Sequence, residues 1–477
     1  MRQTILVESV QGQTRLAVIE ENRLCELYIH RPGSGDVAGS IYLGRVDNAV
    51  PGMNAAFVDF GAEKKGFLSA DDVPGEKLPR PGEALLVQVS KAQSGQKGHR
   101  LTARVTLPGR ALALLPGQRS AGVSKKIADP AERERLRNIA LSLTGNTDVG
   151  VILRTVAQGM PEEALRREFD ALLEQWRSIE ARAAHALPPA LLMDNDSLTL
   201  RCVRDLMGDD VEAVWADGAE VYEDLRRRAE ALAPEKRDIL RLHEGATPVF
   251  DLYRVDAQLE KALRKYVWLK SGGSLVIEET EAMTVIDVNT GKFTGSKNVE
   301  DTLFKINCEA AEEIVRQLRL RNLGGIVIVD FIDMDRQEHN EALLDRLREF
   351  SKTDRSRLTV VGMTGLGLVE LTRRKDRRPL SKQLLHICSS CGGDGMTPAH
   401  DTTARQIVRE IWRRRRGGEE NPLLVTACDK VIGWVRTLGV PGEGAAYGFA
   451  AHDMKPGEYD IAPADGAHLP EEAKRFK

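Results

Sequence analysis

The sequence lacks an apolar run that approaches the ~20 residues needed to cross a membrane. Its first residues, Met-Arg-Gln-Thr-Ile-Leu-Val-Glu, do not form the apolar segment of a signal peptide. Cysteine is also scarce, because only 6 occur among 477 residues, and only Cys388 and Cys391 lie close together. These absences exclude a disulfide-stabilised secreted scaffold and predict a cytoplasmic protein.

The chain also lacks an excess of charge of either sign. It has 68 Lys and Arg residues against 71 Asp and Glu residues, a net charge of −3. Its overall charge therefore does not indicate a nucleic-acid-binding protein, and any phosphate-binding surface must be local. The length predicts two to four domains, and the 42% hydrophobic and 29% charged residues are typical of globular proteins.

Two apolar, β-branched runs that end in carboxylates enclose a predicted helix between residues 283 and 334. The runs lead to Asp287 and Asp330, and the helix is indicated by apolar residues at spacings of three and four: Leu303, Ile306, Ala310, Ile314 and Leu318. Charged groups are costly inside a buried strand, so we expect both aspartates at neighbouring strand ends on one edge of a sheet. With the amide of Asn289, they suffice to hold Mg²⁺ together with water and substrate phosphate for phosphodiester hydrolysis. The competing interpretation is that the aspartates only cap turns.

Three strings in this segment resemble the core of the ribonuclease E/G family of bacterial endoribonucleases. They are Asp287-Val-Asn-Thr-Gly-Lys-Phe, Glu313-Ile-Val-Arg-Gln-Leu-Arg-Leu-Arg-Asn-Leu-Gly-Gly, and Asp330-Phe-Ile-Asp-Met. The similarity continues over nearly the whole chain. The first string and the lack of a long scaffold tail and membrane-binding helix favour the G-type members.

The resemblance implies an α/β multidomain (α+β) chain, in which an RNase H-like domain carries an OB-fold barrel and a 5′-sensor as insertions. The region after residue 198 would return to complete the sheet begun at the N-terminus. The implied parts are RNase H-like (1–34 and 198–266), RNA-binding barrel (35–106), 5′-sensor (107–197), DNase I-like catalytic domain (267–385), zinc link (386–398) and small dimerisation domain (399–477).

Five short strands with glycine turns between residues 39 and 106 favour a small OB-type barrel. Such barrels bind single-stranded nucleic acid by stacking bases on aromatic rings beside cations. Phe57, Phe67 and Lys97 match the residues that serve the family's RNA-binding barrel. From the residues alone, both phenylalanines are more readily interpreted as barrel core.

Arg154 and Thr155 follow an apolar strand and precede a glycine. A guanidinium fork beside a hydroxyl suits a phosphate monoester, although such a pair is more often an ordinary strand end. The resemblance implies that they belong to a 5′-monophosphate sensor, with Arg357 on the other side of the pocket. Gly109 and Ala113 match further pocket positions.

Cys388-Ser-Ser-Cys391-Gly-Gly has the spacing of half a zinc knuckle, whereas structural zinc needs four ligands. A redox pair or a vestigial knuckle are the alternatives. In the family, two subunits share one zinc ion, which implies a homodimer or homotetramer. The two cysteine pairs then supply all four zinc ligands, so His386 is not expected to bind the ion.

Other segments carry simpler predictions. We expect helices over residues 130–143, 161–186, 251–269 and 401–416, and a strand over 198–204. The arginine-rich last helix is interpreted as a solvated face.

The resulting expectation is a Mg²⁺-dependent endoribonuclease that cleaves single-stranded RNA to 5′-phosphate and 3′-hydroxyl ends and responds to a 5′-monophosphate. Asp287 and Asp330 would bind the ion, Asn289 would assist, and Asp333 would be a secondary group or a ligand of another ion. The resemblance implies roles in rRNA 5′-end maturation and mRNA decay. The alternative is a noncatalytic RNA-binding or ribosome-associated protein.

Overall fold

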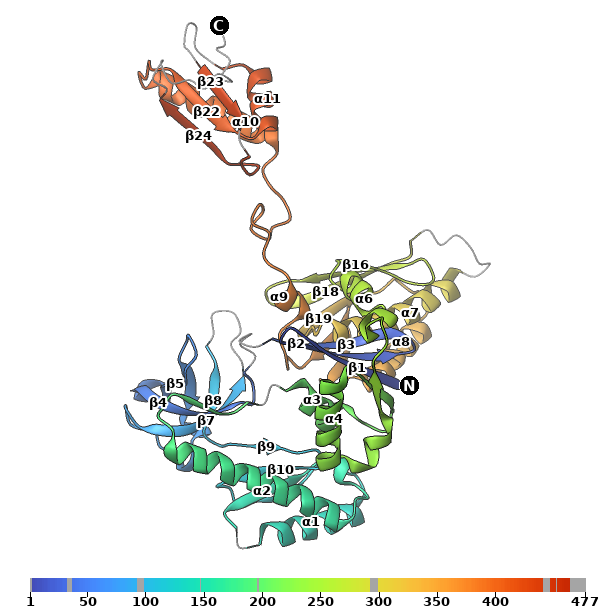
Figure 1. Cartoon of the computed structure of the whole chain (residues 1–477). Helices are drawn as coiled ribbons and strands as arrows, with labels where there is room; N and C mark the ends of the chain where they lie inside the picture. Colours follow the sequence, from blue (N-terminus) through green and yellow to red (C-terminus); the bar gives the residue numbers. More distant parts are fainter. Residues whose placement is uncertain are drawn as a thin grey trace. The chain divides into compact units, whose positions relative to one another are not determined.

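The computed structural model describes residues 2–31, 37–91, 98–145, 147–194, 197–291, 299–440, 447–451 and 453–463. Helices and strands are mixed, as expected for an α/β chain (Figure 1). The chain divides into two compact units, Met1–Gln383 and Leu384–Lys477.

The first sheet of the larger unit joins strands from two distant parts of the chain. Its order is β15-β14-β1-β2-β3, comprising β1 (Gln3–Val10), β2 (Gln13–Glu20), β3 (Arg23–His30), β14 (Val211–Asp217) and β15 (Leu240–His243). β1 is antiparallel to β2 and parallel to β14, so the chain returns to complete the sheet begun at its N-terminus. Helix α4 (Ala219–Leu232) packs against this sheet through a shared buried core.

The prediction of a strand over residues 198–204 is wrong, because this segment forms helix α3 (Leu198–Arg201) and a following helical turn to Leu206. Ser197 caps the helix by accepting a hydrogen bond from the backbone N–H of Leu200. The buried residues Leu198, Thr199, Cys202, Val203 and Leu206 recur at spacings of three and four, which is the pattern of one helix face rather than of a strand that alternates every second residue.

A closed barrel of five strands follows β3 in the sequence. The strands pair in the order β4-β5-β6-β8-β7, and β7 pairs back with β4: β4 (Ile41–Val50), β5 (Ala55–Asp59), β6 (Gly66–Ser69), β7 (Ala84–Lys91) and β8 (Arg100–Thr102). This closure confirms the predicted barrel. A further strand, β13 (Ala190–Met193), pairs with β4 and was not predicted.

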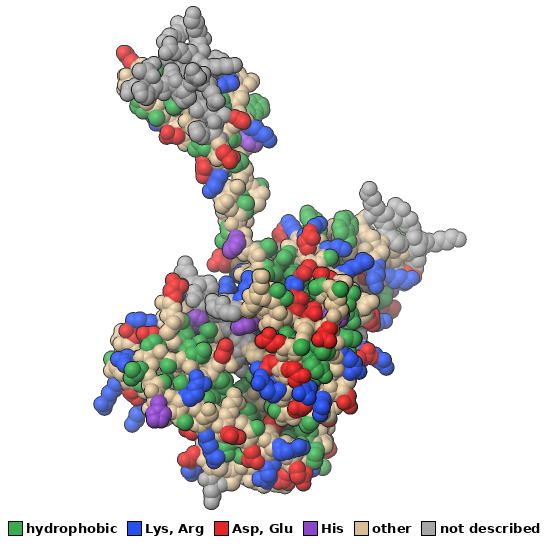
Figure 2. All heavy atoms as spheres, viewed as in Figure 1, with side chains coloured by type: hydrophobic (Ala, Val, Ile, Leu, Met, Phe, Trp, Pro, Cys, Tyr) green, Lys and Arg blue, Asp and Glu red, His purple; other side chains and the backbone are tan. Residues whose placement is uncertain are grey.

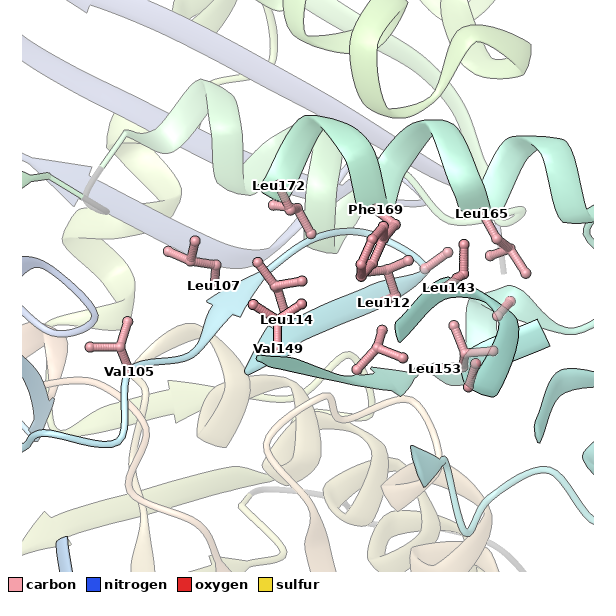
Figure 3. Close-up of a cluster of buried hydrophobic side chains, with 14 of the residues drawn as sticks. Val105, Leu107, Leu112, Leu114, Leu143, Val149, Leu153, Leu165, Phe169 and Leu172 are labelled. Carbon is pink, nitrogen blue, oxygen red and sulfur yellow. The ribbon is translucent and has the colours of Figure 1, made fainter. Parts of the chain in front are cut away.

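A four-stranded sheet and two helices lie between the barrel and β13 in the sequence. The strand order is β11-β12-β10-β9: β9 (Leu107–Pro108), β10 (Leu112–Pro116), β11 (Ala121–Val123) and β12 (Val149–Leu153). The predicted helices are present as α1 (Pro130–Thr144) and α2 (Glu162–His185). Figure 3 shows apolar side chains of α2, among them Leu165, Phe169 and Leu172, meeting those of the sheet in one buried core.

The six-stranded sheet that carries the aspartates has the order β16-β17-β18-β19-β21-β20. Its strands are β16 (Tyr266–Trp268), β17 (Ser274–Glu279), β18 (Met283–Asn289), β19 (Gly325–Asp330), β20 (Leu358–Met363) and β21 (Val369–Arg373). The predicted helix is α7 (Val299–Leu320), and with α8 (Gln337–Ser351) it shares a buried core with one face of this sheet.

The single helix predicted over residues 251–269 is also wrong. The chain instead forms two short helices, α5 (Val249–Leu252) and α6 (Val255–Ala262), before strand β16. Arg254 interrupts the helical path because its φ of 50° is left-handed. Tyr266-Val-Trp268 then joins the sheet, since aromatic and β-branched residues suit a pleated strand.

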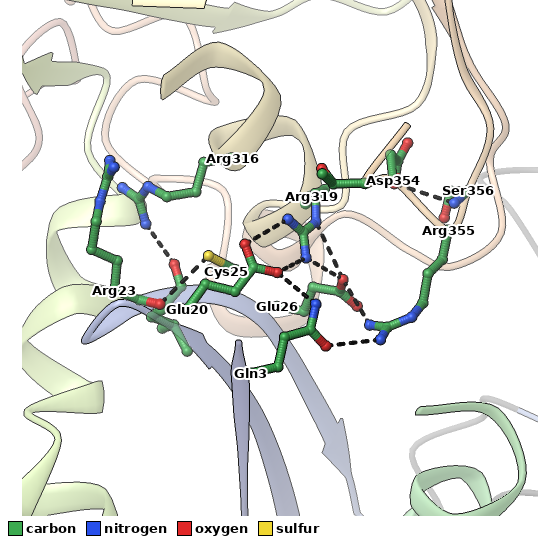
Figure 4. A network of polar contacts seen from close by, with 12 residues as sticks. Gln3, Glu20, Arg23, Cys25, Glu26, Arg316, Arg319, Asp354, Arg355 and Ser356 are labelled. Carbon is green, nitrogen blue, oxygen red and sulfur yellow. Dashed lines mark hydrogen bonds and ion pairs between the residues drawn. The ribbon is translucent and has the colours of Figure 1, made fainter. Parts of the chain in front are cut away.

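A buried ionic network connects α7 with the first sheet (Figure 4). The Arg319 guanidinium donates to Glu20 at 2.7 and 3.1 Å and to Glu26 at 2.8 Å, and Arg355 donates to Glu26 at 3.2 Å. Burial alone would raise the pKa of Glu26, but the charges of Arg319 and Arg355 outweigh it and lower the pKa to about 2. The first sheet is therefore fixed to the aspartate-bearing sheet by charges that are satisfied only together.

The smaller unit follows α9 (Leu380–Leu384). It contains the predicted helix α10 (His400–Arg416), the helix α11 (Asp429–Leu438), which was not predicted, and strands β22 (Leu423–Ala427), β23 (Tyr447–Ala451) and β24 (Tyr459–Pro463). β22 is the central strand, parallel to β23 and antiparallel to β24. Within the described ranges, no helix is both long and apolar enough to cross a bilayer.

Candidate active site

Asp287 and Asp330 lie side by side on two parallel strands. β18 and β19 are neighbours, and their register sets Asp287 opposite Asp330. Ile286, Val288 and Val329 alternate with them and are buried in the core shared with α7. Because side chains alternate between the two faces of a strand, both carboxylates project from the face opposite α7, where they are exposed.

The charge around this pair fits a cation. Asn289 donates from its amide Nδ2 to Asp287 Oδ2 at 2.7 Å, which orients the carboxylate. Among the described residues, no Lys, Arg or His forms an ion pair with Asp287 or Asp330. Nor do those residues contain a group of three or more His, Cys, Asp or Glu side chains that could hold a metal ion. A divalent ion here would take two carboxylates, and water and phosphate would supply its remaining ligands, as Mg²⁺ commonly does.

The loop that follows Asp330 is held by two residues of α7 that the sequence analysis missed. Asn307, with a fully buried side chain, donates to the Ile332 carbonyl at 2.7 Å and accepts from the Ile332 N–H at 3.1 Å. Glu300 accepts from the backbone N–H of Arg336 at 3.0 Å. Asp333 lies on this loop with an exposed side chain. Asn307 could have been found in the sequence, since it lies four residues after Leu303 and three before Ala310, in the apolar stripe of the helix.

Phe57 and Phe67 face outward from the barrel. They are opposite each other on β5 and β6, half-buried, with ring centroids 6.0 Å apart in an edge-to-face arrangement. The alternate positions Val58 and Leu68 fill the barrel core together with Phe60, so the core interpretation of Phe57 and Phe67 is wrong. Lys97 lies outside the described residues.

Two of the cations near these rings are paired with carboxylates, whereas Lys91, opposite Arg100 on β7, is exposed. Arg100 lies on β8, opposite Phe67 on β6, and donates to Asp72 at 3.0 Å. Lys65 pairs with Asp47 at 2.6 Å. Figure 2 shows basic and acidic side chains interspersed over the visible face of the larger unit. RNA contacts on the barrel would therefore depend on the rings as well as on cations.

Arg154 and Thr155 lie at the end of β12. Arg154 donates to the Gly109 carbonyl at 2.6 Å and pairs with Asp205 at 3.3 Å, and Thr155 Oγ1 lies 3.1 Å from Ser124 Oγ. Asp205 also pairs with Arg204 at 2.8 Å, so this group of two arginines and one carboxylate keeps a net positive charge suited to a phosphate.

The other predicted pocket residues lie as follows. A Cβ on Gly109 would come within 2.2 Å of Glu168, so the close approach of α2 requires glycine there. Ala113 is half-buried on β10 and lies opposite Ile152. Arg357 precedes β20 with an exposed side chain.

Cys388 and Cys391 form a compact turn in the smaller unit. The Gly392 N–H donates to the Cys388 carbonyl at 2.9 Å, and Gly392 and Gly393 have positive φ angles of 60° and 101°. Hydrogen bonds from the backbone N–H groups of Cys391 and Ser390 lower the pKa of the Cys388 thiol. N–H groups aimed at the exposed Cys388 sulfur would suit a metal-bound thiolate and fit half of a four-sulfur zinc site.

The sequence model described as the Ribonuclease E/G family matches residues 106–376, more than half of the chain. Ribonuclease G of Escherichia coli (strain K12) is 38% identical over 90% of this chain and 92% of its own length. Ribonuclease G of Haemophilus influenzae is 38% identical over 86% of this chain and 87% of its own length. Ribonuclease E of Escherichia coli is 34% identical over 86% of this chain, which covers 40% of that longer protein. With its barrel and its paired aspartates, this chain belongs to the ribonuclease E/G family of endoribonucleases.

Proposed function

We propose that this enzyme is a Mg²⁺-dependent endoribonuclease that cleaves single-stranded RNA to 5′-phosphate and 3′-hydroxyl ends. The observation that carries the proposal is the register of β18 and β19, which sets two exposed carboxylates side by side without a basic partner among the described residues. Mg²⁺ bound there would activate water and offset charge on the scissile phosphate. Asn289 holds the Asp287 carboxylate in place, and Asn307 fixes the loop after Asp330.

The remaining parts of the proposal follow the family resemblance. Phe57 and Phe67, with Lys97, would bind RNA on the barrel, and Arg154, Thr155 and Arg357 would recognise a 5′-monophosphate. Cys388 and Cys391 would share one zinc ion with the same pair in a second subunit of a homodimer or homotetramer. Ribosomal RNA 5′-end maturation and messenger RNA decay are the proposed roles of a cytoplasmic enzyme.

The test of the proposed activity is incubation of the full chain with a 5′-monophosphorylated, single-stranded oligonucleotide in Mg²⁺ or in EDTA. We expect cleavage only with Mg²⁺, at internal bonds, with 5′-phosphate on the downstream product. RNA binding without cleavage under either condition would support the noncatalytic RNA-binding alternative instead.

Replacing Phe57 with alanine is expected to weaken RNA binding by about 1 to 3 kcal/mol, because an exposed ring that stacks on a base is lost. Fluorescence anisotropy measures the binding, and thermal melting should show a nearly unchanged fold. The matched control is Phe60→Ala, whose ring is 2% exposed in the barrel core and whose loss should lower the melting temperature. A Phe57 variant that melts like the Phe60 variant would contradict the stacking role.

Arg154→Ala is expected to slow cleavage of 5′-monophosphorylated RNA by about 10- to 150-fold, since charge-assisted hydrogen bonds contribute about 1.5–3 kcal/mol. Cleavage of the same RNA with a 5′-hydroxyl should change little. Arg119→Ala removes another arginine near this sheet, 75% exposed and paired with Asp148, and serves as the control. Equal slowing of both RNAs would show that Arg154 has a structural role.

For the cysteine pair, we predict one zinc ion per two chains, because two thiolates fill half of a tetrahedral site and a two-fold axis supplies the other half. Replacing both Cys388 and Cys391 with serine should remove the zinc and shift light-scattering mass toward smaller species. Cys428→Ser, in the same unit, should keep both properties. One zinc per chain would rule out the shared site.

A further inference from the structure

The exposed face that carries Asp287 and Asp330 ends at an edge strand with two aromatic side chains. β16 is the outermost strand of the six-stranded sheet. Trp268 and Tyr266 on this strand are 73% and 57% exposed. Large aromatic rings left in water on one face indicate a surface that binds another molecule.

The strand register places these rings on the same face as the aspartates. Tyr266 lies opposite Val276, which lies opposite Asp287, and Trp268 is connected in the same way through Ser274 to Asn289. Directly opposed residues point to the same face, and neighbouring strands are about 4.8 Å apart. The backbone of each ring residue is therefore about 10 Å from that of the site residue in its row, two strand spacings away.

The aromatic strand also ends at the same end of the sheet as the site. β16 and β18 are both antiparallel to β17, so they run in the same direction and their carboxyl ends lie together. The turns beyond them are in close contact, because a Cβ on Gly291 would lie 2.1 Å from the Gly272 carbonyl oxygen. Trp268 is thus held at a fixed position relative to Asn289.

A cation accompanies the rings. Lys270, two residues after Trp268, is exposed, and no acidic side chain of the described residues pairs with its ammonium group. Its backbone N–H donates to Glu309 at 2.6 Å, which anchors the turn. By contrast, Lys265 at the other end of β16 is paired with Glu278. The unpaired positive charge therefore lies at the end of the strand nearest the candidate metal site.

We propose that Trp268, with Tyr266 beside it, is a stacking platform for a base of the RNA next to the scissile phosphate, and that Lys270 contacts a neighbouring phosphate. This inference rests on the proposed nuclease function, because the aspartate pair defines where the scissile phosphate lies. Aromatic rings beside an unpaired cation are the combination with which proteins bind single strands. An exposed edge strand also pairs with other chains, so a second copy of this protein is the competing occupant.

The test compares Trp268→Ala, Trp268→Phe and the wild type in steady-state cleavage of single-stranded RNA. Trp434→Ala, which removes a 45% exposed tryptophan of the smaller unit, is the matched control. We expect Trp268→Ala to raise KM about 5- to 150-fold with kcat nearly unchanged, corresponding to loss of one stacked base. Trp268→Phe should retain most of the affinity, and Trp434→Ala should behave as the wild type.

A second measurement uses RNAs with one abasic nucleotide at successive positions near the cleavage site. At the position whose base stacks on Trp268, the base deletion and Trp268→Ala should each weaken binding, and their combination should cost no more than either alone. Additive effects at every position would overturn the proposal. So would a drop in the light-scattering mass of Trp268→Ala, which would assign the edge strand to a second copy.

Binding measured by anisotropy in EDTA separates this inference from the proposed function. A wild type that binds RNA through Trp268 but does not cleave it in Mg²⁺ would refute the nuclease proposal while leaving the stacking platform in place. A wild type that cleaves, together with a Trp268→Ala variant of unchanged KM, would refute the platform alone.

Discussion

Replacing Asp330 with asparagine is expected to reduce turnover at saturating Mg²⁺ by on the order of 100-fold or more, with little change in RNA affinity. The substitution keeps the size of the side chain and removes one of two adjacent negative charges. A bound metal ion contributes several kcal/mol of charge stabilisation in the transition state, and each 1.4 kcal/mol corresponds to a factor of ten in rate. Single-turnover cleavage and anisotropy measure the two quantities separately.

The same loop offers a matched control for this experiment. Asp335→Asn removes an equal charge five residues further along, where the side chain is exposed. It should leave turnover nearly unchanged. Asp287→Asn should behave like Asp330→Asn, although it also alters the acceptor of the Asn289 hydrogen bond. Near wild-type turnover in either strand-end variant would refute the two-aspartate site.

Replacing Arg319 with methionine is expected to lower the free energy of unfolding of the larger unit by about 3 to 5 kcal/mol, the usual cost of breaking a buried ion pair from one side. The guanidinium is the shared donor to Glu20 and Glu26, and all three side chains are nearly inaccessible to solvent. Without it, two buried carboxylates face each other, with only Arg355 to offset Glu26. Urea-induced unfolding measures the loss.

Two controls separate the ionic effect from lost packing. In the triple variant Arg319→Met, Glu20→Gln, Glu26→Gln, the stranded charges are absent, so we expect much of the stability to return. In the wild type, the lowered pKa of Glu26 contributes stability above its ordinary pKa near 4.5, and this contribution is lost as the pH falls toward 2. Glu26→Gln should lack this part of the acid dependence. An Arg319→Met variant that is at least as stable as the triple variant would contradict the view that stranded carboxylate charges cause the loss of stability.

The sequence predicted best where local pattern and tertiary environment agree. The apolar runs before Asp287 and Asp330 are strands in the structure, and the two carboxylates lie opposite each other, Asp330 as the last residue of β19 and Asp287 two residues before the end of β18. Phe57 shows the limit of such reasoning, because a phenylalanine in a strand has the same local pattern whether it faces the core or the solvent. Only the register of the closed barrel decides between them.

The errors arose where tertiary contacts or a single backbone angle override local preference. The segment from Leu198 to Leu206 was predicted as a strand, but its buried residues, which pack against the first sheet, are spaced by three and four as in a helix. The left-handed Arg254 divides what resembles one basic helix, and nothing in the residue type predicts that angle. Glu300 carries no sequence signal, and Asn307 is marked only by its place in the apolar stripe of α7, because the partner of each side chain depends on which loop α7 meets.

The pairing of β1 with β14 constrains the order in which the protein can fold on the ribosome. The hairpin of β1 and β2 is made first, but the strand that pairs with the other edge of β1 begins only at Val211. Synthesis adds about 5 to 20 residues per second, so the edge of β1 stays without its partner strand for roughly 10 to 40 s. The barrel lies wholly within this interval and needs no later strand except β13 to complete its pairing. Nascent chains paused before residue 211 should therefore present a folded barrel beside an apolar strand edge open to chaperones.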